Sequence, residues 1–148
     1  MHQHNDESSK LLFKNLKGTV EIFGLLLSAP IEGVPAILRT RALLRRITVS
    51  FIALYEYLRE KSHLEKEMHN KPLEEITEFF VKERVLDAED KDSFIKLGSI
   101  YGAIRWPAPG SQTDTVKILE NVPELYTFLS RLVVAHDTHP KEQESSIR

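Results

Sequence analysis

The chain has 148 residues, 41% of them hydrophobic and 28% charged, which is the usage of one ordinary globular domain. It has no cysteine, so disulfides, thiolate metal sites and cysteine nucleophiles are excluded. The formal net charge of −2 argues against a surface that binds polyanions as a whole, but it permits a local basic patch.

The two ends of the chain are polar and aperiodic, which predicts flexible tails at 1–7 and 137–148 around a single helical domain at 8–136. A first helix is predicted to open at Ser8 or Ser9 and to end at Pro30. Its apolar end does not fit a signal peptide, because Glu21 interrupts it and Pro30 follows it. No stretch approaches the roughly 20 apolar residues that span a membrane, so we expect a cytoplasmic protein without membrane contacts.

The second predicted helix begins at Pro35 and runs to about residue 67, and it carries the strongest periodicity in the chain. Its apolar residues recur at heptad spacing, and further apolar positions widen the stripe. Such a width indicates burial on more than one side, as in the central helix of a bundle. The residues expected at the centre of the core are Leu44, Ile47, Phe51 and Leu54.

Three more helical segments follow. Pro72 opens a short helix that ends near Arg84, and another is predicted to begin at Asp87, whose carboxylate would cap it. A last helix spans roughly 115–135, and either it kinks at Pro123 or a new helix starts there. No strand-like alternation competes, so the predicted fold class is an all-α bundle of about four to five helices.

Basic residues are concentrated in the first 50 residues, whereas the rest of the chain is acidic. The densest group lies on the second predicted helix and comprises Arg39, Arg41, Arg45 and Arg46. These arginines could contact phosphates and form a nucleic-acid-binding patch. The alternative is that they pair with carboxylates of neighbouring helices or of a second subunit. The absence of aromatic residues beside them in the sequence favours the alternative.

The strongest catalytic candidates are Arg131 and His136 near the end of the last helix. Together they could perform RNA cleavage, the histidine moving the proton of a ribose hydroxyl and the arginine stabilising the phosphorane. Five residues of helix place them about 140° apart, which argues against a shared face. The histidine pairs near the chain ends lack a rigid frame, and the acidic residues at 74–92 suit first turns of helices, so we expect no metal and no cofactor.

Over about residues 36–134, the predicted helices lie in three successive segments, "LRTRALLRRITVSFIALYEYL", "LEEITEFFVKERVLDAEDKDSFIKLGSIYGAIRWPAPG" and "KILENVPELYTFLSRLV". The order and apolar pattern of these helices resemble those of the HEPN superfamily. The resemblance implies a small, commonly dimeric helical bundle from toxin–antitoxin or phage-defence systems, acting as an RNase or as the partner of a nucleotidyltransferase. Active members carry an Arg followed a few residues later by a His, often with an Asn after the Arg. At the matching place, Gly102 fits, Ala103 replaces the Asn, and Trp106 or Pro107 stands roughly where the His is expected. This implies a degenerate, non-cleaving member.

The sequence therefore favours a non-enzymatic interaction or regulatory protein, an accessory component of such a system, that binds a protein partner or a second copy of itself. Trp106 and Tyr101 are the predicted interface residues, since an indole often anchors an interface. Alternatively, Trp106 plugs the end of its own bundle. Two other functions stay open: an RNase that uses Arg131 and His136, and a nucleic-acid-binding regulator that uses the arginine patch.

Overall fold

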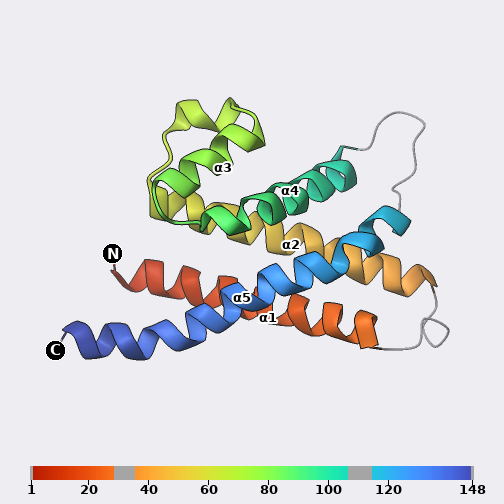
Figure 1. The fold of residues 1–148 in the computed structure, drawn as a ribbon, viewed down its shortest axis with the longest axis horizontal. Helices are drawn as coiled ribbons and strands as arrows, with labels where there is room; N and C mark the ends of the chain where they lie inside the picture. Colours follow the sequence, from red (N-terminus) through yellow and green to blue (C-terminus); the bar gives the residue numbers. More distant parts are fainter. Residues whose placement is uncertain (1, 29–35, 107–114, 148) are drawn as a thin grey trace.

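The computed structural model describes residues 2–28, 36–106 and 115–147, and within them the side chains of 9–25, 27, 41–106 and 120–137. The helices are α1 (His2–Ser28), α2 (Ala36–Ser62), α3 (Leu73–Lys82), α4 (Lys91–Arg105) and α5 (Thr115–Ile147), with short 3-10 helices η2 (Lys66–Asn70) and η3 (Ala88–Asp90) (Figure 1). The described part of the chain contains no strand, which confirms the predicted all-α class.

The helices pack in two groups that meet at α2 and where α4 packs against α5. α1 and α5 run side by side in opposite directions, and α1 also packs along α2 (Figure 1). On the other side of α2, α4 runs antiparallel to it, while α3 packs against α4 near the C-terminal half of α2. α2 therefore contacts α1, α3 and α4, as expected for a central helix.

The core is apolar and aromatic, and it follows the stripe of α2. Ile47 and Leu54 are buried, Phe51 is 8% exposed, and Phe80 and Phe94 close the core from α3 and α4. Leu44 was also expected at the centre, but it is only partly buried. The physical reason is that α4 ends at Arg105, so less of it covers the N-terminal half of α2.

One buried polar contact fixes α1 against α2. Thr19 and Ser50 are both fully buried, and their hydroxyl oxygens are 2.7 Å apart, joined by a hydrogen bond. Thr19 also donates to the carbonyl oxygen of Asn15 at 3.1 Å. Because an unpaired buried hydroxyl is costly, this pair favours one register of the two helices.

Two helices end on residues in the left-handed backbone conformation, His63 with φ 55° and Arg84 with φ 62°. In each case the N–H of the left-handed residue and the N–H of the next residue donate to carbonyl oxygens in the last turn of the helix, as in a Schellman motif. α2 therefore ends at Ser62, several residues before the predicted end near residue 67. The usual marker, glycine, is absent from both positions.

At three places the structure differs from these expectations or decides between them. Helix extends into both segments predicted as flexible tails, since α1 begins at His2 and α5 ends at Ile147. Asp87 does not cap α4 with its side chain; it precedes η3, and α4 starts only at Lys91. The open question at Pro123 resolves as one helix, because α5 continues through it.

Candidate functional site

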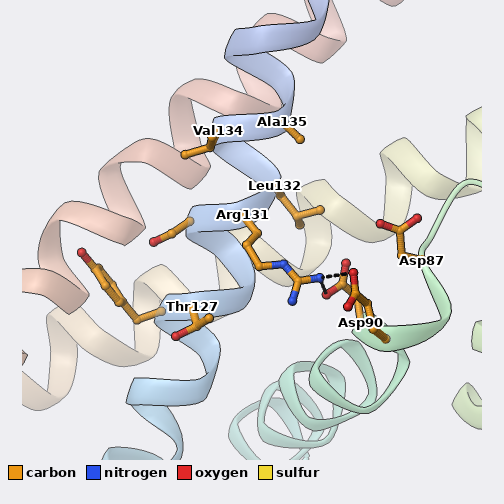
Figure 2. Close-up of a pocket in the computed structure, with 10 residues that line it drawn as sticks. Asp87, Asp90, Thr127, Arg131, Leu132, Val134 and Ala135 are labelled. Atoms are coloured by element: carbon orange, nitrogen blue, oxygen red, sulfur yellow. Dashed lines mark hydrogen bonds and ion pairs between the residues drawn. The ribbon is translucent and has the colours of Figure 1, made fainter.

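Arg131 lies on α5 at a cleft between that helix and the segment that leads into α4. Its guanidinium Nη2 lies 2.5 Å from the Asp90 carboxylate and 3.1 Å from that of Glu89 (Figure 2). The cleft has a volume of about 560 Å³ and an adjoining one about 300 Å³, and both include these three residues. Arg131 is thus held by two carboxylates and clamps α5 to η3.

Most of the charged residues that line this cleft are acidic, and burial shifts the pKa of one of them. The Asp90 side chain is only 5% exposed, and burial raises its pKa, an effect that Arg131 opposes. Beside it, Glu124 accepts hydrogen bonds from Lys96 and Ser93, and the lysine contact lowers the pKa of that glutamate. These carboxylates serve contacts between helices, and no group of residues in the described part of the chain is arranged to hold a metal ion.

His136 occupies a different place from Arg131. Its ring stacks on Phe13 of α1, with centroids 3.7 Å apart and planes at 13°. Its Nδ1 is buried and lies 3.6 Å from Asp137, whose pKa is lowered chiefly by a hydrogen bond from Lys17. Arg131 therefore faces η3 and His136 faces α1, so the structure does not bring the two candidate catalytic residues together.

Trp106 is the most exposed of the large hydrophobic side chains in the described part of the chain, at 70%. Its ring makes an edge contact with Tyr101, 6.0 Å between centroids, and Tyr101 stacks on Phe51 at 4.9 Å. Phe51 in turn contacts Phe94 in the core at 5.6 Å. A continuous row of rings thus leads from the core to the surface, and Trp106 does not plug the bundle.

The surface beside Trp106 is open. A Cβ added at Gly102, one turn earlier on α4, would meet no atom within 4 Å, whereas one added at Gly98 would lie 2.8 Å from the Phe51 ring. Ile52, next to Phe51 on α2, is 45% exposed. α4 is therefore tightly packed at Gly98 and uncovered at its C-terminal end.

The predicted arginine patch divides between two sides of α2. Arg46 lies over Gly18 of α1, where its guanidinium would be 2.8 Å from an added Cβ. Arg41 and Arg45 are exposed, and the side chain of Arg39 lies outside the described residues. Because α2 and α4 are antiparallel and Phe51 contacts Tyr101, the helix halves that carry the exposed arginines and Trp106 lie at the same level.

We define the α2–α4 face as the exposed surface formed by these two helix halves. Its members are Arg41, Arg45, Ile52, Tyr101, Gly102, Arg105 and Trp106. Sequence reasoning named four of the seven as site residues but did not group them. The signal that could have grouped them is the periodicity of α2 and α4, which predicts two packed helices but not their direction.

No known protein family matches the chain, and neither a curated protein nor a solved structure shows significant similarity to it. Among the described residues, no helix has the length and apolar character needed to cross a membrane.

Proposed function

We propose that the protein is a non-enzymatic helical binding domain that engages a macromolecular partner through the α2–α4 face. The observation that carries this proposal is the exposure of Trp106 at the end of a row of rings anchored in the core. An indole held in place by such packing loses little conformational entropy on binding, and Trp, Tyr and Arg are the residue types most enriched at energetic centres of interfaces.

The absence of a shared site for Arg131 and His136 supports a binding role over RNA cleavage. Arg131 is neutralised by Asp90 and Glu89, so its charge is not free to stabilise a phosphorane. His136 stacks on Phe13 of α1, away from Arg131. The proposal further includes a HEPN-like fold and an accessory role in a toxin–antitoxin or phage-defence system, which rest on the resemblance in helix order described above. It also includes a cytoplasmic location, which rests on the pattern of apolar residues in the sequence.

Photo-crosslinking tests the binding role whatever the chemical class of the partner. A diazirine amino acid is introduced at position 106 in cells, and at Glu83, an exposed position at the end of α3, as the matched control. We expect discrete protein or nucleic-acid adducts from position 106 and none of these from position 83. Equal adduct patterns from both positions, or no adduct from 106, would show that the face is not a contact surface.

A further inference from the structure

The α2–α4 face carries positive charge that nothing described in the chain neutralises. Residues 41–55 of α2 and 97–106 at the end of α4 contain four arginines and no acidic residue. Arg46 turns toward α1, which leaves Arg41, Arg45 and Arg105 exposed on this face. None of these three forms an ion pair with a residue that the structure describes.

Elsewhere in the described chain, some basic side chains are paired across helices, whereas others, such as Lys82 and Arg84, are exposed and form no ion pair with a described residue. Lys17 bonds to Asp137 between α1 and α5, Lys91 reaches Glu78 from α4 to α3, and Arg131 clamps α5 to η3. The exposed arginines of the α2–α4 face likewise have no ion pair within the bundle, and what distinguishes them is that they lie at the level of the exposed Trp106. An anionic ligand that they could share is the simplest complement to their charge.

The aromatic residues of the face narrow the class of anion. Trp106 is 70% exposed, so a large part of its indole is free to stack, while Tyr101 supports it from below and is itself covered by Phe51. An aromatic surface beside cationic side chains is the arrangement by which proteins bind unpaired bases and their phosphates. A free carboxylate or an acidic peptide would use the arginines but would leave the indole without a planar partner.

The geometry favours a single strand over a duplex. By the rise of an α-helix, Arg45 lies about 9 Å along α2 before Phe51, and Trp106 about 7.5 Å along α4 beyond Tyr101. The face is thus a short row of basic side chains with an aromatic ring at one end. Stacking on Trp106 requires a base that is not already paired and stacked.

We propose that the α2–α4 face binds single-stranded nucleic acid, with Trp106 stacking on a base and Arg41, Arg45 and Arg105 contacting phosphates. This inference rests on the proposed function, because it names the partner of the same face. In the sequence these arginines of α2 lack a neighbouring aromatic residue, whereas the packing of α4 on α2 supplies one.

The test uses the fact that Trp106 is the single tryptophan of the chain, so tryptophan emission reports on this face alone. The full-length protein is titrated with oligouridylate of about 12 nucleotides at about 50 mM salt. We expect saturable quenching of Trp106, and a log–log salt dependence of the affinity with a slope of about −2, as three phosphate contacts on a single strand predict.

Variants separate stacking from charge in an anisotropy assay with labelled oligouridylate. Trp106→Ala should weaken binding by about 5- to 100-fold and leave the salt slope unchanged. Arg45→Gln should weaken binding and reduce the magnitude of the slope by about 0.7. Lys82→Gln, an exposed cation at the end of α3, is the matched control and should change neither quantity.

Three results would overturn the proposal. The first is the absence of quenching by oligouridylate at about 50 mM salt, where non-specific binding alone should be seen. The second is binding of poly-glutamate with the same affinity and the same loss in Trp106→Ala, which would assign the face to acidic proteins. The third is a shift of the Trp106 emission with protein concentration alone, which would assign it to a second copy. The second and third results would leave the proposed binding role of the face intact, because each only assigns it another partner. The binding role itself is refuted only if position 106 gives no specific crosslink.

Discussion

Phe51 joins the core to the α2–α4 face, so its truncation to alanine is the most informative change to stability. The ring is 8% exposed and packs within 6 Å, centroid to centroid, of Tyr55, Phe94 and Tyr101. Alanine removes nearly the whole buried ring and leaves a cavity whose walls are other rings, which relax little. Phe→Ala substitutions in cores cost about 3–5 kcal/mol, and the three ring contacts place Phe51→Ala at about 4 kcal/mol.

Urea unfolding followed by far-UV circular dichroism measures this loss as a change in the free energy of unfolding. The control is Ile52→Ala, because Ile52 adjoins Phe51 on the same helix but is 45% exposed, and it should cost about 1 kcal/mol or less. If Phe51→Ala cost less than about 2 kcal/mol, or no more than Ile52→Ala, the row of rings would not be anchored in the core. Trp106 would then lack the rigid support that the proposed function requires.

Three other changes test the packing and the electrostatics. Gly98→Ala should lose about 1–3 kcal/mol by overpacking, whereas Gly102→Ala should gain up to about 1 kcal/mol from helix propensity, as read by urea midpoints. Thr19→Val and Ser50→Ala should each cost about 1–3 kcal/mol, but the double variant should cost less than their sum in a double-mutant cycle. Because burial raises the pKa of Asp90, the folded chain keeps this proton to a higher pH than the unfolded chain. Its contribution to stability should therefore fall as the pH rises above about 4, the ordinary value of an aspartate, and in Asp90→Asn that part of the pH dependence should be absent.

The presence of each helix could be predicted from the sequence because it depends on the local periodicity of apolar residues. The ends of two helices could not, because the usual marker of a helix C-terminus, a glycine, is missing there. Pro72 marks the start of α3 correctly, since a proline suits the first turn. The end of α2 was predicted several residues too late and that of α3 only approximately, because His63 and Arg84 adopt the left-handed conformation that glycine usually supplies. Pro123 was ambiguous because a proline can start a helix or interrupt one, and only the packing of α5 on its neighbours decides.

The candidate site was harder to predict because its members come from distant parts of the sequence. Arg41 and Arg45 precede Trp106 by some sixty residues, and only the antiparallel packing of α2 and α4 brings their helix halves to one level. The sequence predicted one patch of Arg39, Arg41, Arg45 and Arg46, since these residues share one helix. Helix geometry separates Arg46 from Arg45 by about 100°, which turns Arg46 toward α1 and leaves Arg45 exposed.

The arginines of this chain do two different jobs, and stability measurements can tell them apart. Arg131 compensates Asp90, whose side chain is only 5% exposed, so Arg131→Ala would leave a buried carboxylate with fewer partners and should cost about 1–3 kcal/mol. Arg45 has no such partner among the described residues, and Arg45→Ala should change the free energy of unfolding by less than about 0.5 kcal/mol. Both are measured by urea unfolding at neutral pH and low salt. A loss in Arg45→Ala as large as that in Arg131→Ala would mean that the α2–α4 face is needed for folding, and its free charge could then not be assigned to a partner.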